Sequence, residues 1–546
     1  MPFGYVCLGD ERGLNTLQRV LDIVERYANR PFLIDSVSDR IFSFGEFHRL
    51  ACNLAMGLRE QGIRRGDRIA IILNNSAEFA ILYFACLYLG AVAVPINPQL
   101  HKRDIEFILR HSGAKMVLYS PSTKELITPA LFERDGFCTL CLLPKAEQDK
   151  EHCEHVIWLV DDTPAENIDG WRPFDNVTPD DLFTITFTSG TTSLPKGVPH
   201  RINSLLRCAI VFNEELGFGP ENRFYHVLTM AYMAGILNTL LCPFLAGASV
   251  VICRAFDARL AIEFWRAPIR YGVNTLWMVP TILSTLLRID RNRPGLAYCH
   301  KHINTICVGT APLPLKLKRD FENKYGVGLF ESYGLSETLF VTTNSKKVKY
   351  LPDSVGRALP GVALKIVDKS WAEVPHGEDG EIWIRTSYLM AGYLNYQTLQ
   401  PDASDLGKWF PSGDIGHLTP DGHLFITGRK KDLIIRGGIN ISPRVVEDVL
   451  REHESIAQVA VVGVPHEFYG EEVVAVVKLK AGYTLDAVRP ALDELCRGNL
   501  SAVSIPTEFF ELDEFPTSTT GKIQKTKLRE LVAANWAHRR DSDRRT

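Results

Sequence analysis

The chain has 546 residues, of which 46% are hydrophobic and 23% charged, and its formal net charge at pH 7 is -3. Such a length exceeds what one hydrophobic core usually organises, so we expect at least two domains. The near-neutral charge gives no electrostatic reason to predict nucleic acid or an anionic membrane as a partner. No apolar run approaches the roughly 18 residues that span a bilayer, so we expect no transmembrane anchor.

The N-terminus and the cysteines indicate the compartment. The first residues, MPFGYVCLGDERGLNTL, lack the basic and long apolar regions of a secretory signal. The 12 cysteines are scattered, which is typical of free thiols in a reducing environment. We therefore predict a cytoplasmic protein. One cluster has residue types that bind zinc: Cys138, Cys141, His152, Cys153 and His155. Its first pair lies in the strand-like run FCTLCLLP, which favours buried thiols over a metal site.

In chain order, helix-like and strand-like segments alternate through the first part of the sequence. Leucine and phenylalanine recur at helical spacing over 47–58, and RIAIIL (68–73) is typical of a buried strand. The same alternation recurs at 248–253, 274–279 and 304–309. It predicts parallel sheets with helices on their faces. We therefore expect an α/β fold whose large N-terminal domain, residues 1–430, contains several subdomains and mostly parallel sheets.

The pattern changes around GRKKD (428–432). Beyond it we predict a strand LIIR, a helix near 445–451, strands at 459–464 and 473–479, a helix at about 486–496 and a strand EFFEL. These elements form a small, mobile α+β C-terminal domain, residues 431–546. The last residues, HRRDSDRRT, are expected to be a solvated charged tail.

A hydroxyl-rich loop, TFTSGTTSLPKGVPH, spans residues 186–200. Backbone amides of a Gly/Ser/Thr turn form an anion-binding concavity, and Lys196 adds a positive charge. The loop is not a Walker A motif, because Lys196 precedes Gly197 and Val198 and is not followed by Ser or Thr. On these residues alone, a phosphate loop and an ordinary surface turn are equally consistent.

Four further segments follow the loop: ESYGLSET (331–338), WFPSGDIG (409–416), GRKKDLIIRGGINISP (428–443) and TTGKIQKTKLRE (519–530). Together with the loop they resemble the core motifs of the acyl-adenylate-forming superfamily. That superfamily contains acyl-CoA and aryl-CoA synthetases, peptide-synthetase adenylation domains and firefly-type luciferases. The resemblance is greatest to an acyl-CoA synthetase and runs from about Ser43 to about Arg529. Each motif is weak by itself, whereas five in the same order are specific.

The resemblance implies a role for each matching residue and implies ATP and Mg²⁺ as cofactors. The loop that holds the β- and γ-phosphates is matched by Thr188, Ser189, Gly190, Thr191, Thr192 and Lys196. The motif beside the adenine comprises Glu331, Ser332, Tyr333, Gly334 and Ser336, and the Mg²⁺ ligand is Glu337. The ribose contacts are Asp414 and Arg429. The residues expected to act in catalysis are Lys522, which reaches the α-phosphate and the substrate carboxylate, Glu337 and Thr191.

The chemistry requires these residue types. A carboxylate that attacks a polyphosphate approaches a negative centre, so a cation such as Mg²⁺ and a lysine must neutralise the charge. Taken singly, Asp414 fits a turn cap, Glu337 a surface acid, Tyr333 a core aromatic and Lys522 a solvated lysine. Their joint occurrence favours adenylate formation.

Several positions depart from the family pattern. Serine replaces threonine at 336 and 412, and both substitutions keep a hydroxyl. The segment after Lys196 is shorter than the common form, which leaves the surroundings of His200 open. Ala231 and Tyr232 stand where the family often has Phe-His.

The stretch LTMAYMAGIL (228–237) matches the wall of the family's acyl pocket. Ala234 stands where enzymes that activate α-amino acids place an aspartate, and an ammonium buried against alanine would have no partner. The predicted pocket residues are Tyr232, Ala234, Gly235, Gly309, Thr310, Leu335 and Phe340. They indicate an apolar acid, either fatty or aromatic, although core packing is an alternative for Tyr232.

The segment RGGIN (436–440) resembles the glycine loop that covers the thioester site, where glycine lets the backbone approach a narrow pantetheine arm. We assign Gly437, Gly438 and Asn440 to this loop and Lys431 to the hinge between the domains, with a solvated linker lysine as the alternative. Coenzyme A is the expected acceptor. A carrier-protein thiol, an amine, a catalytically inactive nucleotide-binding protein and a homo-oligomer stay open.

Overall fold

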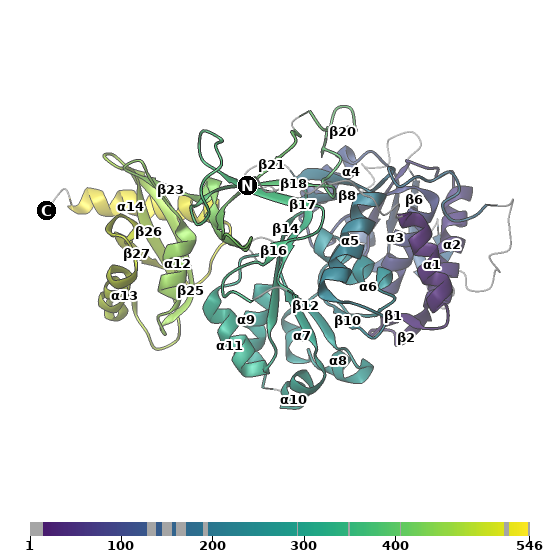
Figure 1. Ribbon diagram of the computed structural model, residues 1–546, viewed down its shortest axis with the longest axis horizontal. Coiled ribbons are helices and arrows are strands. Elements are labelled where there is room, and N and C mark those ends of the chain that lie inside the picture. Colours follow the sequence, from purple (N-terminus) through teal and green to yellow (C-terminus); the bar gives the residue numbers. More distant parts are fainter. Residues whose placement is uncertain are drawn as a thin grey trace.

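A computed structural model describes residues 15–127, 138–144, 156–159, 171–188, 195–291, 293–347, 350–404, 406–517 and 523–543. Figure 1 shows a large domain and, at the left of the view, a small domain that follows it in the sequence. The described strands form sheets of nine, seven, five, four and two strands. The predicted fold class is confirmed: the large domain is built mainly on parallel sheets, and the smaller C-terminal domain is α+β.

The first sheet has nine strands in the order β16-β15-β14-β13-β12-β10-β11-β1-β2. Strands β1, β11, β10, β12, β13 and β14 pair in parallel, and antiparallel strands extend both edges. The bounds are β1 Pro31–Asp35, β2 Arg40–Ser43, β10 Arg223–His226, β11 Ser249–Ile252, β12 Thr275–Met278, β13 Thr305–Val308, β14 Leu329–Leu335, β15 Leu339–Thr343 and β16 Arg357–Ala358. The three recurring strands predicted from the sequence are β11, β12 and β13.

The second sheet has seven strands in the order β7-β6-β5-β3-β4-β8-β9. All its pairs are parallel except the antiparallel hairpin of β8 and β9. The bounds are β3 Arg68–Ile72, β4 Val92–Pro95, β5 Ala114–Tyr119, β6 Cys138–Pro144, β7 Val156–Leu159, β8 Leu182–Thr188 and β9 Lys196–Arg201. The predicted phosphate loop therefore connects the two strands of this hairpin.

Helices packed between the two sheets form the main core (Figure 1). Helix α3 (Ala77–Leu89) is buried on every side except at Glu78, as expected for a helix that is apolar all round. Helix α2 (Phe44–Glu60) packs against it and begins at a capping box. There the Glu46 amide donates to Ser43 Oγ and the Ser43 amide donates to Glu46 Oε2, at 3.1 and 2.7 Å.

The other helices of the large domain complete both layers. They are α1 Thr16–Tyr27, α4 Lys102–His111, α5 Ile202–Leu216, α6 Cys242–Leu245, α7 Ala258–Ile262, α8 Arg266–Tyr271, α9 Pro280–Ile289, α10 Arg293–His302 and α11 Leu315–Tyr325. A π-helix, η4 (Ala234–Leu241), precedes α6, and a short 3-10 helix η1 spans Pro121–Leu126. None of the described helices is long and apolar enough to cross a membrane.

Two smaller sheets complete the large domain. The antiparallel one has the order β17-β18-β21-β22, and the other pairs β19 with β20. Their bounds are β17 Val362–Val367, β18 Gly380–Thr386, β19 Tyr393–Leu394, β20 Pro401–Asp402, β21 Phe410–Leu418 and β22 Leu424–Arg429. The sequence analysis did not predict these strands.

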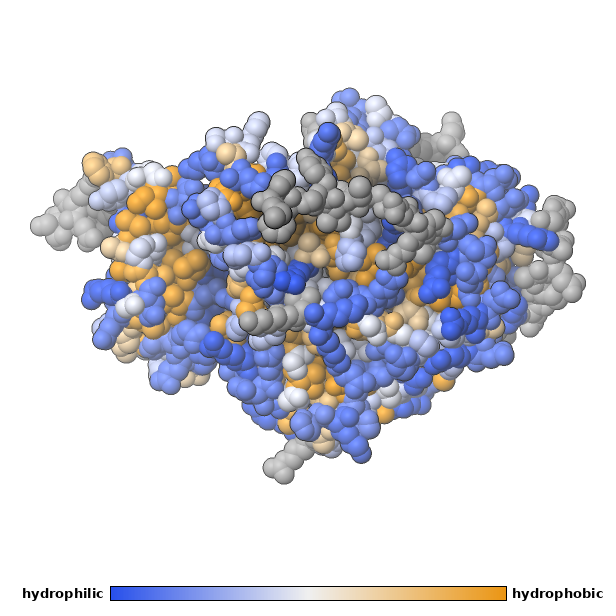
Figure 2. Space-filling model, in the orientation of Figure 1, coloured by the Kyte–Doolittle hydropathy of each residue, from blue (hydrophilic) through white to orange (hydrophobic). Residues whose placement is uncertain are grey.

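The small domain packs helices on both faces of one sheet. Its elements are β23 Ile434–Arg436, β24 Ile439–Ile441, α12 Pro443–Arg451, β25 Ile456–His466, β26 Gly470–Leu479, α13 Leu485–Asn499, β27 Glu508–Glu511 and α14 Lys525–Asp543. Val461 alternates with Val462 on the sheet, so α12 and α13 cover one face and α14 the other. The short helices η5 (Lys430–Asp432) and η6 (Ala502–Ser504) lie in its connections. Figure 2 shows hydrophobic residues over this domain, in the area of α12 and the sheet.

Two details refine the sequence analysis. The charged C-terminal segment, expected to be a solvated tail, continues α14 as far as Asp543. Cys138 and Cys141 lie on β6, as their strand-like run predicts, whereas His152, Cys153 and His155 fall outside the described residues.

Candidate active site

Thr188 and Lys196 lie at the two ends of the predicted phosphate loop. Thr188 ends β8, Lys196 begins β9, and the two residues pair across the hairpin. Ser189, Gly190, Thr191 and Thr192 lie outside the described residues. The hairpin therefore brings together the threonine and the lysine expected to contact phosphate.

Two tyrosines, Tyr393 in β19 and Tyr396 just after it, contact residues at the start of β9. The Lys196 ammonium lies 4.9 Å from the centre of the Tyr393 ring, within cation–π range. The Tyr396 hydroxyl donates to the Pro195 carbonyl and accepts from the Gly197 amide, the latter at 3.3 Å. A Cβ on Gly197 would lie 2.9 Å from the side chain of Leu394, so glycine lets β19 approach this closely. The sequence analysis missed both tyrosines.

Tyr393 also connects the loop to Glu337. Its hydroxyl donates to Glu337 Oε1 at 2.8 Å, and burial, together with this neighbouring carboxylate, raises the pKa of Tyr393. The Met390 amide donates to the Glu337 carbonyl oxygen at 2.8 Å, which fixes the backbone. The predicted Mg²⁺ ligand and the predicted phosphate-binding lysine thus contact the same side chain, Glu337 at the hydroxyl of Tyr393 and Lys196 at its ring.

His200 supports the turn that carries Glu337, an outcome left open by the sequence. Its Nε2 is 2.6 Å from the Ser336 carbonyl oxygen. Burial lowers the pKa of His200 to about 4, although this hydrogen bond opposes the shift. His200 is therefore neutral at pH 7, and Nε2 donates its proton to the carbonyl oxygen.

Tyr333, Asp414 and Arg429 meet at the predicted ribose position. The Tyr333 hydroxyl donates to Asp414 Oδ2 at 2.7 Å, and Arg429 Nε lies 3.1 Å from Asp414 Oδ1. Burial and the negative charge of Asp414 raise the pKa of Tyr333 well above its ordinary value. The Asp414 amide donates to Ser412 Oγ at 3.0 Å, so the serine that replaces threonine keeps this contact. A buried carboxylate with two donors is the result.

Gly334 follows Tyr333 at a position where the backbone is crowded. A Cβ on Gly334 would lie 2.1 Å from the Leu339 carbonyl oxygen, so the tight pairing of β14 with β15 requires glycine. Leu335 ends β14 and is partly exposed.

Glu331 and Ser332 make contacts within the large domain. Glu331 Oε1 lies 2.7 Å from the Lys318 ammonium, and the two side chains are 7% and 1% exposed. Burial raises the pKa of Glu331, and Lys318 opposes the shift. Burial lowers the pKa of Lys318 but the attraction of Glu331 outweighs it, so the net shift is upward. The Ser332 and Thr343 hydroxyls are 2.8 Å apart. The nucleotide roles of Glu331 and Ser332 stay predictions.

The predicted acyl pocket collects residues from several elements. Tyr232 and Ala234 are partly exposed, and the Tyr232 hydroxyl accepts from Asn97 Nδ2 at 3.1 Å. A Cβ on Gly235 would lie 2.2 Å from the Thr229 carbonyl oxygen, so glycine lets η4 pack tightly at its start. π-Helical turns are frequent at functional sites. Thr310 is exposed and has a φ of 69°, the left-handed region that a threonine rarely adopts.

The predicted hinge and glycine loop lie where the small domain begins. Lys431 is in η5, and burial and the charge of Arg429 lower its pKa, whereas Asp432 and Asp414 oppose the shift. Gly437 and Gly438 have φ of 56° and 83° at the exposed β23–β24 turn, and Asn440 is also exposed. Glycine is required at this turn, because other residues adopt such φ values only with strain.

The small domain docks on the large one through α12. Lys316 of α11 donates to the carbonyl oxygens of Arg451 and Glu452 at 3.1 and 3.0 Å, where a cation is favourable beside a helix C-terminus. Arg444 Nη1 donates to the Ile426 carbonyl oxygen at 2.5 Å. These contacts fix one orientation of the two domains.

Lys522 lies outside the described residues. After it, Ile523 bridges to Thr517, and Lys525 forms a 2.6 Å ion pair with the buried Glu447 of α12. The chain on the C-terminal side of Lys522 is therefore attached to the docking helix.

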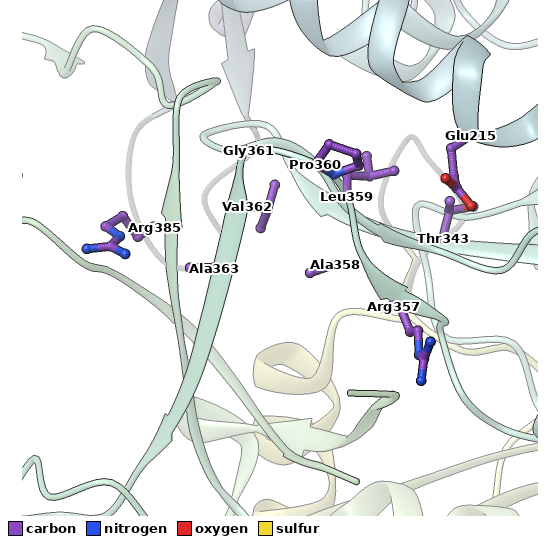
Figure 3. A pocket seen from close by; sticks show the side chains of 10 residues that line it. All are labelled: Glu215, Thr343, Arg357, Ala358, Leu359, Pro360, Gly361, Val362, Ala363 and Arg385. Atoms are coloured by element: carbon purple, nitrogen blue, oxygen red, sulfur yellow. The ribbon is translucent and has the colours of Figure 1, made fainter. Parts of the chain in front are cut away.

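A cavity of about 540 Å³ lies beside the connection between β16 and β17, whose residues form part of its wall (Figure 3). Leu359, Pro360 and Val362 line it, and the side chains of Arg357 and Arg385 point in different directions. None of the predicted adenylation residues that the structure describes lines it. It touches the nucleotide motif only indirectly, because its Thr343 faces Ser332 across the β14–β15 pair, so we assign it no role in adenylation.

Comparisons with known proteins match this arrangement. The model of the AMP-binding enzyme family matches residues 21–394, and the model of the AMP-binding enzyme C-terminal domain matches residues 445–522. Sulfoacetate–CoA ligase of Cupriavidus necator is 29% identical over 511 residues, which cover 92% of this chain and 95% of that protein. Medium-chain fatty-acid–CoA ligase of Escherichia coli is 30% identical over 499 residues, covering 89% and 84%. ATP-bound MatB from Rhodopseudomonas palustris aligns with a TM-score of 0.81 at 26% identity, covering 95% and 99%.

Proposed function

Since the chain belongs to the AMP-binding enzyme family, we propose that it activates a carboxylic acid with ATP and transfers the acyl group to the thiol of coenzyme A. A carboxylate oxygen of the acid bonds to the α-phosphorus as the bond to the pyrophosphate oxygen breaks, which gives an acyl-adenylate and pyrophosphate. The thiol then loses its proton, its sulfur bonds to the acyl carbon, and AMP leaves. Both relatives described above are named as CoA ligases, which supports CoA as the acceptor.

The observation that carries this proposal is the buried Asp414 carboxylate, which accepts from Tyr333 and Arg429 on the segments that match the nucleotide motifs. A ribose diol would displace or join these donors, because a carboxylate accepts two hydrogen bonds side by side. Tyr333 would place its ring beside the adenine. Glu331, Ser332, Gly334 and Ser336 would shape the rest of this nucleotide site.

The anionic end of ATP would lie at the β8–β9 loop. Thr188, the residues 189–192 and Lys196 would donate to the β- and γ-phosphates, and Thr191 would act close to the reaction. Lys522 would reach the α-phosphate and the acid carboxylate, where it would offset the negative charge that develops as they approach. The Tyr393 ring would hold the Lys196 ammonium in place before the nucleotide binds.

Glu337 fits Mg²⁺, because a carboxylate is a ligand that this ion prefers and the Tyr393 hydroxyl fixes its orientation. When bound, the ion would supply charge neutralisation for the phosphates. Tyr393 and the backbone contact from Met390 would keep the carboxylate facing the loop.

The acid has an apolar acyl part, fatty or aromatic, in this proposal. Tyr232, Ala234 and Gly235 of the η4 segment, Gly309 and Thr310, and Leu335 and Phe340 would surround it. No aspartate stands at Ala234, so a free α-amino acid would lack a partner for its ammonium.

The two half-reactions would use two orientations of the small domain. The turn at Gly437 and Gly438 is exposed in the docked arrangement, and Ile435 and Ile439 beside it are 51% and 48% exposed. Exposed apolar residues are favoured at surfaces that become covered. Rotation about Lys431 would bring Asn440 and the glycines to the thioester site. The boundary between the two domains, placed between residues 430 and 431, is part of this proposal.

A pyrophosphate-release screen tests the function. Purified protein is incubated with Mg²⁺, ATP and fatty, benzoic, cinnamic or amino acids, with and without CoA. We expect acid-dependent release, and thioester only when CoA is present. A carrier protein or an amine that replaces CoA more effectively would favour the alternative acceptors. Absence of release with every acid would favour an inactive nucleotide-binding protein, and equal rates with GTP would contradict the adenine role of Tyr333. The cytoplasmic location and the oligomeric state stay predictions.

A further inference from the structure

Three aromatic rings pack together beside the predicted acyl pocket: Phe212 of α5, Trp277 of β12 and Phe340 of β15. The Phe212 and Phe340 ring centroids are 3.8 Å apart, with an interplanar angle of 14°. The Trp277 centroid is 5.5 Å from that of Phe212 and 5.4 Å from that of Phe340. The residues are 0%, 2% and 6% exposed in the order Phe212, Trp277, Phe340. Phe340, which the sequence analysis assigned to the acyl pocket, therefore also belongs to a buried aromatic trio.

The trio borders the turn that carries Gly309. A Cβ on Gly309 would lie 3.8 Å from Trp277 Cζ2 and 3.0 Å from the Ser332 carbonyl oxygen. The turn thus passes between the indole and the nucleotide motif. On the other side, Phe340 follows Leu339, whose φ of 57° is rare for leucine and whose carbonyl oxygen approaches the nucleotide motif closely. Both connections place the trio beside the nucleotide motif, and the first places it beside Gly309, a predicted pocket residue.

The indole of Trp277 has a polar atom without a partner. Nε1 is buried and has no hydrogen-bond partner in the described part of the chain. Buried indole N–H groups usually have one. Cζ2 is the indole atom nearest to the Gly309 position. Because Nε1 and Cζ2 are both bonded to Cε2, the N–H lies on the same edge of the ring as Cζ2. An acceptor atom that reached this edge of the ring would satisfy the buried donor, whose desolvation otherwise has no compensating hydrogen bond.

We propose that the aromatic trio closes the far end of the acyl chamber, and that the acid is short and carries a neutral hydrogen-bond acceptor, such as a ketone or ether oxygen, at its distal end. The inference rests on the proposed function and narrows the apolar acid named there. A long chain would have to displace three packed rings, and close-packed interiors accommodate added volume poorly. A charged distal group would lose its hydration among rings that offer no countercharge.

Wild-type enzyme gives the first test. Acid-dependent pyrophosphate release is measured with butyrate, valerate, hexanoate, octanoate and levulinate, where levulinate differs from valerate by one ketone oxygen. We expect kcat/KM to fall at least about tenfold from valerate to octanoate and to be about tenfold higher for levulinate than for valerate. A value for octanoate equal to or above that for valerate would overturn the length limit while the proposed function stood. If none of these five acids causes pyrophosphate release but another acid of the wider screen does, the inference is overturned and the proposed function stands. If no acid of either set causes release, both are overturned.

Substitutions at two positions then separate the role of the rings from that of the N–H donor. Phe340→Ala should raise kcat/KM for octanoate about tenfold relative to valerate, because it opens the end of the chamber. Phe340→Leu is the variant to use if Phe340→Ala does not fold, and a smaller shift in the same direction is expected. Trp277→Phe keeps an aromatic ring without the N–H, so levulinate should lose its advantage over valerate.

The control is Phe321→Ala on α11. Phe321 is fully buried and stacks on Tyr325 with ring centroids 4.3 Å apart. Phe321→Ala therefore removes a stacked core ring outside the trio, just as Phe340→Ala removes one within it. Its acid profile should equal that of the wild type. An equal shift in Phe321→Ala would attribute the effect to general loosening and overturn the proposal. So would an unchanged profile in folded Phe340 variants, or a levulinate preference that survives in Trp277→Phe.

Discussion

Replacing Lys318 with methionine tests whether its ion pair with Glu331 stabilises the large domain. The two groups are 2.7 Å apart, and their side chains are 1% and 7% exposed. Removing one partner of a buried pair leaves a charge without compensation, which costs about 3–5 kcal/mol in the free energy of unfolding. The double variant Lys318→Met with Glu331→Gln removes both charges and should regain about 2 kcal/mol or more of that loss. Urea unfolding followed by tryptophan fluorescence measures both values.

A matched control and the pH dependence make the test of Lys318 specific. Arg254→Met breaks a 3.0 Å pair with Glu263 whose side chains are 41% and 45% exposed, so it should cost less than about 1 kcal/mol. Burial raises the pKa of Glu331 above its ordinary value, and without Lys318 only the charge of Arg444 still opposes the shift. A raised carboxyl pKa gives stability at low pH that is lost as pH rises. The Lys318→Met deficit should therefore grow with rising pH. A deficit equal to that of Arg254→Met, or one independent of pH, would refute the reasoning.

Three further predictions concern catalysis. Tyr393→Phe removes the donor to Glu337 and should lower kcat/KM about tenfold, consistent with one hydrogen bond to a charged group, with a higher Mg²⁺ requirement in titrations; an unchanged requirement would contradict the orienting role. Asp414→Asn should raise the KM for ATP more than it lowers kcat, and an unaltered KM would argue against the ribose contact. Lys522→Ala should lose most adenylate formation yet convert supplied acyl-adenylate and CoA to thioester, whereas Lys431→Pro should do the reverse because proline fixes φ. Equal damage to both half-reactions by either variant would contradict the rotating-domain proposal.

The sequence predicted elements whose pattern is local. The apolar runs that became β11, β12 and β13, and the alternating strands β25 and β26, carry their own periodicity. Tyr393 and Tyr396 were missed because their partners lie 56 and about 200 residues away, and the only local signal was the run GYLNY. Lys318 lies among charged residues in LKLKRD and is typical of a solvated lysine by sequence, yet it is almost wholly buried. Phe340 was placed in the acyl pocket from the motif alone, since ring stacking with α5 leaves no trace in local sequence.

The docking of α12 has a consequence for how this interface can change over evolution. Lys316 and Arg444 donate to main-chain oxygens of Arg451, Glu452 and Ile426. Every residue supplies a carbonyl oxygen whatever its side chain, so substitutions at these three acceptor positions preserve the acceptors. Selection on these three hydrogen bonds would therefore act on the two donor positions alone. Compensating pairs of substitutions, from which contacts between domains are commonly deduced, would not accumulate across these hydrogen bonds.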